Sequence, residues 1–328
     1  MDNLTHTLYG LALSQAGLNR VHPRATSAIL IGANLPDIDM ISLFWGPLKC
    51  LEYHRGFTHG IAGVICGASL LTAVVGGWHW KFSRQSNPGW WKLPLAALAG
   101  TGSHLLLDYT NSYGIRPFLP FSGAWYALDL VFIIDPWILL IFLLSLGLPF
   151  LLRLVSQEIG ARSSAYSRGA MVCLLLIAGY WGVKQWSHRQ AIQELDQAGF
   201  RTGAPMQVGA MPKIFNLLGW HGIVETSAAF HTVDVGWSPR SPLTSQRNRT
   251  YRKAVEDGVL KAALQSRTAR IFSDFARFPV VTVEPIDEGY RVTIRDLRFD
   301  FATERRKRFL CTIELDQSLR VTSESFRF

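Results

Sequence analysis

The chain has 328 residues, of which 48% are hydrophobic and only 17% are charged, and its formal net charge is +9. Soluble domains usually have closer to a quarter of their residues charged, so this composition argues against an ordinary soluble protein. The positive charge does not indicate nucleic-acid binding, because many basic residues of the first half lie in short loops between apolar runs. No nucleic-acid partner is expected. Length and uneven hydropathy predict two domains, an α-helical multi-pass membrane domain over residues 1–187 and a smaller soluble α+β domain over residues 188–328.

Residues 1–187 contain six apolar segments, which predict about six membrane-embedded helices. The last two segments are the clearest, because about 20 apolar residues cross a bilayer. The third and fourth are rich in small residues, which let helices pack closely in a membrane. The first is short and the second is interrupted by Pro36, so these two also fit a hairpin that does not fully cross. The six segments are Leu4–Leu18, Thr26–Phe44, Gly60–Trp78, Leu93–Tyr109, Leu128–Leu152 and Gly169–Trp186.

The loops between these segments predict the orientation in the membrane. Loops 19–25, 79–92 and 153–168 fall on one side and carry eight Arg and Lys residues, with Glu158 as their single acid. Basic loops stay in the cytoplasm, so this pattern predicts an inner-membrane protein with its C-terminal domain on the outer, periplasmic side. The basic residues are Arg20, Arg24, Lys81, Arg84, Lys92, Arg153, Arg162 and Arg168.

From about Gly203 the chain has segments rich in Val, Ile, Thr and Phe with partial alternation, which is typical of β-strands. A helical stretch over about Tyr251–Phe275 lies between them. This pattern predicts an α+β domain with a mostly antiparallel sheet. The four cysteines form no CxxC or close pair, so no disulfide framework is expected. The predicted strands include His221–Val235, Val280–Glu284, Tyr290–Ile294 and Phe309–Leu315.

The fourth apolar segment ends with His104 and Asp108, which are four residues apart. On a helix they lie on one face about a turn apart, where an imidazole and a carboxylate can bind one metal ion or the carboxylate can bridge two. The alternative is a hydrogen-bonded pair at a helix end. Because acids and imidazoles are costly in apolar surroundings, the pair indicates a functional site.

Asp37 and Asp39 follow Pro36, which is expected to bend the chain. Two carboxylates this close resist joint ionisation unless a cation lies between them. We expect one of the two to be a ligand and the other to support the site, and the sequence does not rank them. An Asx turn after Pro36 is the alternative.

Two histidines, His54 and His59, precede the third apolar segment. His59 begins that segment, which favours a role as ligand, whereas His54 is predicted as a second ligand or a proton donor. Arg55 can hold a phosphate or carboxylate oxygen bidentately, or it can reach to the interface as an ordinary basic residue. His6 alone would be an ordinary interfacial histidine, but the predicted topology places it at the same membrane level.

Asp129 and Asp135 bound a very apolar stretch and fit ligands, a base or helix N-caps. The chain has no Walker loop, GxGxxG fingerprint, GxSxG elbow or HExxH helix. These absences argue against nucleotide-binding and serine-hydrolase functions.

Together these motifs resemble the YdjM-type family of membrane-bound metal-dependent hydrolases. The resemblance covers about residues 1–187, and the second half also looks like the extension found in longer members. It rests on the order and spacing of His6, Leu35-Pro36-Asp37-Ile38-Asp39, His54-Arg55-Gly56-Phe57-Thr58-His59, Ser103-His104-Leu105-Leu106-Leu107-Asp108, Asn111-Ser112-Tyr113-Gly114, Asp129 and Asp135.

The same pattern is similar to the zinc-dependent phospholipase C and single-strand nuclease superfamily, whose multi-zinc site cleaves phosphodiesters. That resemblance implies Asp108 as a bridge between ions. There is no histidine between His104 and His188 to complete a three-metal site, so one or two divalent ions are expected, zinc first and manganese as the alternative. The implied ligands are His6, Asp37 or Asp39, His59, His104 and Asp108.

The expected function is hydrolysis of a phosphoester or similar bond in a membrane lipid or lipid-linked substrate by metal-activated water. His54 or one of the two aspartates, Asp37 and Asp39, is the expected base, and Arg55 is expected to steady the substrate anion. Loop 110–127 is expected to shape the pocket. The alternative is a non-catalytic membrane protein that uses the metal for structure or transport.

Overall fold

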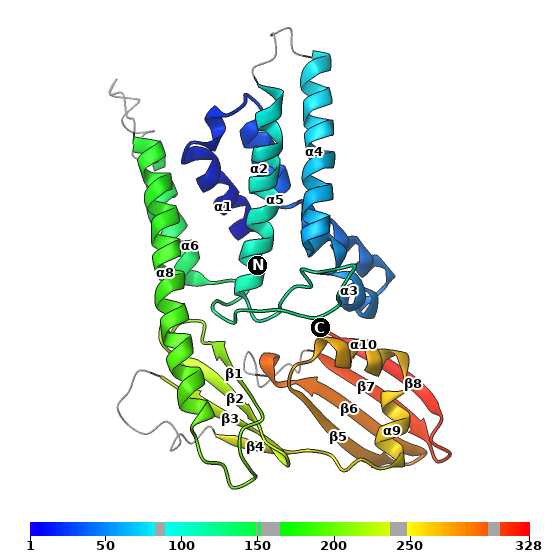
Figure 1. The fold of residues 1–328 in the computed structure, drawn as a ribbon. Coiled ribbons are helices and arrows are strands. Elements are labelled where there is room, and N and C mark those ends of the chain that lie inside the picture. Colours follow the sequence, from blue (N-terminus) through cyan, green and yellow to red (C-terminus); the bar gives the residue numbers. More distant parts are fainter. Residues whose placement is uncertain (83–88, 149, 152–164, 237–247, 301–308) are drawn as a thin grey trace. The chain divides into compact units, whose positions relative to one another are not determined.

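The computed structural model describes residues 1–82, 89–148, 150–151, 165–236, 248–300 and 309–328 (Figure 1). The chain divides into two compact units. Unit 1 contains Met1–Asp39 and Arg55–Gln185, and unit 2 contains Met40–His54 and Trp186–Phe328. Several predictions fall outside the described residues, namely the loop residues Arg84, Arg153 and Arg162 and the end of the fifth predicted helix at Leu152.

Unit 1 is helical, and its helix ends follow local sequence signals. Asp2 caps the first helix by accepting a hydrogen bond from the backbone N–H of Thr5, and Asp135 caps α6 in the same way. Pro36 lies at the start of a 3₁₀ helix, Leu35–Trp45, instead of continuing α2. The helices are α1 (Asn3–Gln15), α2 (Ala25–Gly32), α4 (Ile61–Phe82), α5 (Leu93–Thr110), α6 (Pro136–Phe142) and the part of α8 (Ala165–Asp196) up to Gln185.

Two segments among the described residues are long and apolar enough to cross a membrane, Ala25–Trp45 and Ile61–Trp78. The prediction of six embedded helices is therefore not supported. α1 is too short to span a bilayer. Polar residues such as His104 and Lys184 lower the mean hydropathy of α5 and α8.

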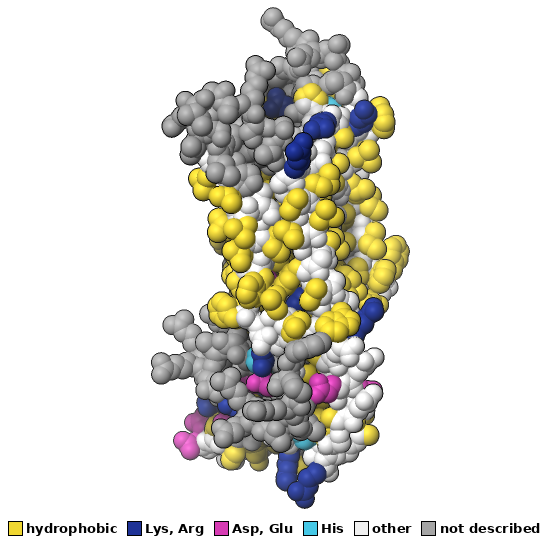
Figure 2. Space-filling view, turned by 90° about the vertical axis from the view of Figure 1, so that its left-hand side faces the viewer, with side chains coloured by type: hydrophobic (Ala, Val, Ile, Leu, Met, Phe, Trp, Pro, Cys, Tyr) yellow, Lys and Arg dark blue, Asp and Glu magenta, His cyan; other side chains and the backbone are white. Residues whose placement is uncertain are grey.

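The fifth predicted helix does not begin at Leu128, because residues 128–135 lie in a loop and α6 begins at Pro136. It continues as a short π-helical turn, Leu143–Gly147. The helices of unit 1 nevertheless carry many exposed apolar side chains, and Figure 2 shows such side chains gathered over one face of them. On α8 these include Leu175, Leu176 and Val183.

The helices α2 and α5 pack at close range because a glycine on each helix faces the backbone of the other. A Cβ atom on Gly100 would lie 2.4 Å from the carbonyl oxygen of Ile29, and one on Gly32 would lie 3.0 Å from that of Ala97. The buried residues around this contact are small or aliphatic, including Ala28, Ile29 and Ala96. Small residues thus bring the two helices together, as in other membrane helix pairs.

Unit 2 contains two four-stranded antiparallel sheets in the orders β1-β2-β3-β4 and β5-β6-β7-β8. The predictions of a β-rich second half and of antiparallel pairing are confirmed. The strands are β1 (Gln207–Pro212), β2 (Trp220–Glu225), β3 (Ala229–Val235), β4 (Arg249–Arg252), β5 (Pro279–Ile286), β6 (Gly289–Asp296), β7 (Leu310–Asp316) and β8 (Val321–Arg327).

Two predictions for this half are wrong in detail. The segment His221–Val235 is not one strand but a hairpin, β2 and β3, which pair in register from Trp220 opposite Val235 to Glu225 opposite Phe230. The predicted helix Tyr251–Phe275 begins as strand β4 and then gives two helices, α9 (Gly258–Leu264) and α10 (Arg267–Phe275). The break occurs because Ser266 caps α10 through a hydrogen bond from the N–H of Ala269.

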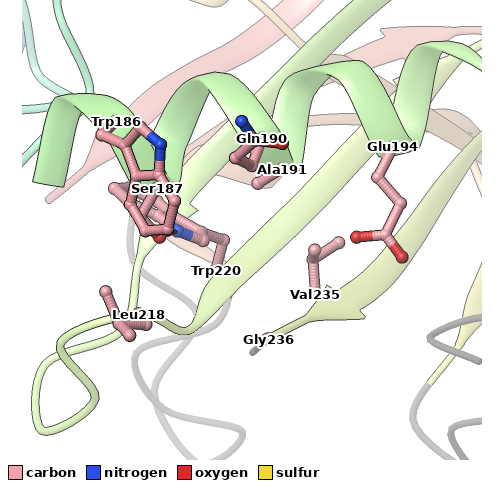
Figure 3. A pocket seen from close by; sticks show the side chains of 9 residues that line it. All are labelled: Trp186, Ser187, Gln190, Ala191, Glu194, Leu218, Trp220, Val235 and Gly236. Carbon is pink, nitrogen blue, oxygen red and sulfur yellow. Dashed lines mark hydrogen bonds between the residues drawn. The ribbon is translucent and has the colours of Figure 1, made fainter. Parts of the chain in front are cut away.

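The end of α8 packs on the first sheet. Ala191 and Leu195 are buried against Trp220, Val224 and neighbouring strand residues. Beside them lies an open pocket of about 320 Å³ between this helical turn and the ends of β2 and β3 (Figure 3). Trp186 and Glu194 mark two of its walls, and the Nε1–H of Trp220 donates to the hydroxyl of Ser187 at its base.

Candidate metal centre

Four side chains from three segments of unit 1 meet at one point. Asp37 lies at the start of the 3₁₀ helix, His59 ends a 3₁₀ turn before α4, and His104 and Asp108 lie on α5. One ligand atom from each lies within 4.8 Å of those of the other three. His59, His104 and Asp108 are fully buried.

The spacing of these atoms suits a small metal ion. His59 Nε2 lies 3.4 Å from Asp37 Oδ1 and 3.3 Å from Asp108 Oδ2. His104 Nε2 lies 3.5 Å and 3.6 Å from the same two oxygens, and the two Nε2 atoms are 3.0 Å apart. A tetrahedral zinc site with ligands at about 2.0–2.1 Å has edges of about 3.3–3.4 Å, which is close to the four distances between an imidazole nitrogen and a carboxylate oxygen.

The Nδ1 atoms of the two histidines both have hydrogen-bond acceptors, which favours the tautomers that turn the Nε2 lone pairs toward the group. His104 Nδ1 lies 2.7 Å from the carbonyl oxygen of Ala33, which can only accept, so Nδ1 carries the hydrogen. His59 Nδ1 lies 3.1 Å from Asp39 Oδ2 and 3.1 Å from the Thr58 hydroxyl. That hydroxyl already donates to Asp39 at 2.6 Å, so it accepts from His59.

Four acceptors therefore face one another in a buried space. Among the described residues, Asp108 Oδ2 has no hydrogen-bond donor, and the imidazoles of His59 and His104 face the two carboxylates. Such an arrangement is costly without a cation, because buried charge and lone pairs need a partner. The donor set of two imidazole nitrogens and two carboxylate oxygens fits zinc, and also manganese.

The structure gives Asp37 and Asp39 different neighbours. Asp37 contributes an oxygen to the four-atom group, whereas Asp39 accepts from the Thr58 hydroxyl and from the backbone N–H of Arg55 at 3.0 Å, and faces His59 Nδ1. A carboxylate on the far nitrogen of a ligating histidine fixes its ring and raises its basicity. Asp37 therefore belongs to the four-atom group, and Asp39 lies against the far nitrogen of His59.

Arg55 is buried, which excludes a side chain that extends to the interface. Its guanidinium donates to Asp108 Oδ1 at 3.1 Å and to Asn111 Oδ1 at 2.9 Å, and it stacks on the ring of Tyr113. Burial lowers the pKa of Arg55 to about 10, so the side chain keeps its charge at neutral pH. Arg55 thus holds the second oxygen of Asp108 and ties α5 to the following loop.

His6 joins the group from α1. Its ring stacks on that of His104 with centroids 3.8 Å apart, and its Nε2 lies 3.4 Å from Asp108 Oδ1. Both ring nitrogens of His6 are buried without a hydrogen-bond partner. Asp108 therefore faces the four-atom group with one oxygen and His6 with the other, and the backbone nitrogen of Met1 also contacts this second oxygen.

Asp135, Asp129 and His54 contribute no atom to this four-atom group. Asp135 accepts from the N–H groups of Trp137 and Ile138 and from the Tyr180 hydroxyl, so it is a helix cap. Asp129 is buried and has a positive φ of 56°. His54 ends α3 (Pro47–Tyr53) and belongs to unit 2, so its predicted role stays a prediction.

Sequence reasoning missed two supporting groups. Thr58 orients both Asp39 and His59, and its place directly before a candidate ligand was the available signal. The carbonyl oxygen of Ala33 fixes His104 but belongs to the backbone, so no residue type indicates it. Asn111, which the sequence assigned to the shape of the pocket, instead links Arg55 to the N–H of Tyr113.

Comparison with known proteins identifies a family for the first half and a relative along most of the chain. The family model described as YdjM inner membrane protein matches residues 1–191. The chain is also 30% identical over 309 residues to "Uncharacterized protein YfhP" of Bacillus subtilis (strain 168), covering 91% of this chain and 87% of that protein. No solved structure gives a significant match.

Proposed function

The chain belongs to the YdjM inner membrane protein family, and we propose that it is a metal-dependent hydrolase acting on a phosphoester or similar bond of a lipid or lipid-linked substrate. The observation that carries the proposal is the buried group of four acceptors, Asp37, His59, His104 and Asp108, at the spacing of metal ligands. A surplus of candidate ligands around it, His6 among them, supports an open site rather than a closed structural one.

The proposed ligands of a first ion are these four side chains. Asp108 Oδ1 and His6 are the groups that would contribute to a second ion, with zinc expected and manganese as the alternative. A divalent ion bound here would supply Lewis acidity and make water a nucleophile at neutral pH. Orienting the ligands, balancing the charge of the substrate and accepting a proton are the proposed tasks of side chains of the chain itself.

Those side chains have distinct proposed roles. Asp39 keeps His59 in the tautomer that offers Nε2, and Arg55 holds Asp108 in place through a charge-assisted hydrogen bond. The positive charge of Arg55 also lowers the cost of an anionic substrate beside Asp108. His54 is the proposed base, and Asp39 is the second candidate for that role.

A lipid substrate is supported by exposed apolar side chains on the segments that carry the centre. Ile38 stands between the two aspartates and is 62% exposed, and Phe57 stands two residues before His59 and is 48% exposed. Loop 110–127 joins this region through a hydrogen bond from the N–H of Ile61 to the carbonyl oxygen of Pro117, and its Phe121 is 92% exposed. Exposed apolar groups beside a polar centre suit an amphiphilic substrate.

The proposal is tested with detergent-purified full-length protein and a panel of phospholipid, lipid-linked phosphate and nucleotide substrates. Metal-loaded protein is expected to hydrolyse one lipid class, chelator to abolish activity, and zinc or manganese to restore it. His59→Ala should abolish turnover, because it removes a ligand. Arg55→Lys should weaken turnover by about tenfold or more, since a point charge cannot replace the planar fork.

The second candidate function is metal binding without catalysis. The burial of His59, His104 and Asp108 favours it, because a structural site needs no substrate access. It predicts stoichiometric metal, a lower melting temperature after chelation, and no turnover on any substrate of the panel. If metal-loaded wild type and His59→Ala are equally inert, the hydrolase proposal is wrong and this function leads.

A further inference from the structure

The two halves of the metal centre are joined in sequence by residues 40–54, which we call the linking segment. Asp39 directly precedes it and Arg55 directly follows it. The two flanking residues are hydrogen-bonded to each other, because Asp39 Oδ2 accepts from the backbone N–H of Arg55 at 3.0 Å. The linking segment therefore forms a loop whose closure places both residues.

The linking segment itself belongs to unit 2. Its helix α3 contacts α10 and β8, and the side chains of Cys50 and Leu51 on α3 are each 1% exposed. Glu52 Oε2 accepts from Arg267 at the start of α10 at 3.0 Å. The N–H of Thr268 in turn donates to Glu324 on β8, which ties α10 to the second sheet.

We propose that residues 186–328 act as a clamp that positions the metal centre by holding α3. This inference rests on the proposed function, since it assigns a role to the C-terminal region at the same centre. The physical reason is loop entropy. Closing a free loop costs conformational entropy, and anchoring its middle on a folded domain removes much of that cost before Asp39 and Arg55 meet.

The buried face of α3 is expected to supply most of the anchoring. Leu51 loses nearly all its contact with solvent, whereas Arg267 is 53% exposed in its side chain and an exposed ion pair contributes little. Leu51 is therefore the positioning residue to test. Leu43 is the matched control, because it lies in the same linking segment and is 45% exposed.

The experiment measures cobalt(II) binding and its visible absorption spectrum in the full-length chain. Leu51→Ala is expected to weaken cobalt binding by about tenfold and to change the spectrum, as loss of support around metal ligands does. Leu51→Met should restore both, since it refills the same volume. Leu43→Ala should match wild type. Wild-type affinity and spectrum in a folded Leu51→Ala variant would overturn the clamp.

A pair of variants at Arg267 covers the case in which Leu51→Ala does not fold. Arg267→Glu places two carboxylates together and should weaken cobalt binding, although less than Leu51→Ala does, whereas Arg267→Ala removes only an exposed ion pair and should stay near wild type. Arg267→Glu with wild-type cobalt binding would overturn the clamp. Failure of the proposed function is distinguishable from failure of the clamp, because the wild-type protein itself would then bind no cobalt.

Discussion

At the scale of single residues, Asp37 and Asp39 show how neighbours acquire different roles. They are two positions apart on a 3₁₀ helix, and both face His59. Asp37 meets its Nε2, the side that also faces His104, whereas Asp39 meets Nδ1 together with Thr58. Because the two nitrogens of one ring point in different directions, we expect Asp37 to bind metal and Asp39 to orient the ring.

This difference predicts that substitutions of Asp37 and Asp39 reduce metal binding to different extents. Asp37→Asn should remove most of the bound metal, because it deletes a charged ligand atom from the buried group. Asp39→Asn should lower affinity by about 10–100-fold and leave the stoichiometry at saturation unchanged, as removal of a supporting carboxylate does. Elemental analysis and zinc titration of the purified variants check both. Equal loss of stoichiometry in the two variants would mean that Asp39 is itself a ligand.

At the scale of elements, the contact between α2 and α5 sets the position of His104. Gly100 on α5 lies against the backbone of Ile29 on α2, and one turn further along each helix Ala33 accepts from His104 Nδ1. The close approach that glycine permits therefore also fixes the histidine. A side chain at position 100 would push apart the two elements that this hydrogen bond joins.

Gly100→Ala is accordingly expected to destabilise the protein by about 1–3 kcal/mol, since its Cβ would lie 2.4 Å from the Ile29 carbonyl oxygen. It should also weaken metal binding through His104. Gly102→Ala is the control on the same helix, because nothing lies within 4 Å of its Cβ, and it should be neutral or slightly stabilising. Thermal unfolding in detergent measures both. A Gly100→Ala variant as stable as Gly102→Ala would contradict the close-packed contact.

At the scale of the whole molecule, two features concern the membrane. The chain belongs to an inner membrane protein family and has two candidate spans among its described residues. The charge bias of the loops is a separate observation from the sequence, and it favours a cytoplasmic side for Arg20, Arg24, Lys81, Lys92 and Arg168. A C-terminal domain outside the cytoplasm remains a prediction from that bias.

Fusions after Phe328 test the orientation. Alkaline phosphatase is expected to be active and a fluorescent protein dark, because the basic loops hold the opposite side in the cytoplasm. Removing basic residues from these loops should weaken the preference for one orientation. Replacing Lys81 and Lys92 with glutamine is therefore expected to lower phosphatase activity. A bright fluorescent fusion with inactive phosphatase would reverse the orientation and place the metal centre toward the cytoplasm.

The sequence by itself determined the family, the helical first half and the antiparallel second half, and it singled out the residues of the candidate centre. It could do so because His104 and Asp108 share a helix face by spacing alone, and because alternating Val, Ile and Thr residues mark strands. Sequence spacing could not rank Asp37 and Asp39, since that depends on which nitrogen of His59 each one meets.

Only the tertiary structure decided how the centre is supported. The hydrogen bond from His104 to the carbonyl oxygen of Ala33 and the contacts of α3 with α10 and β8 join segments far apart in the chain, which leave no local pattern. The sequence is limited in the same way when it is used to predict membrane spans. Apolar composition marks a segment as buried, but whether lipid or protein surrounds it depends on its neighbours in the fold.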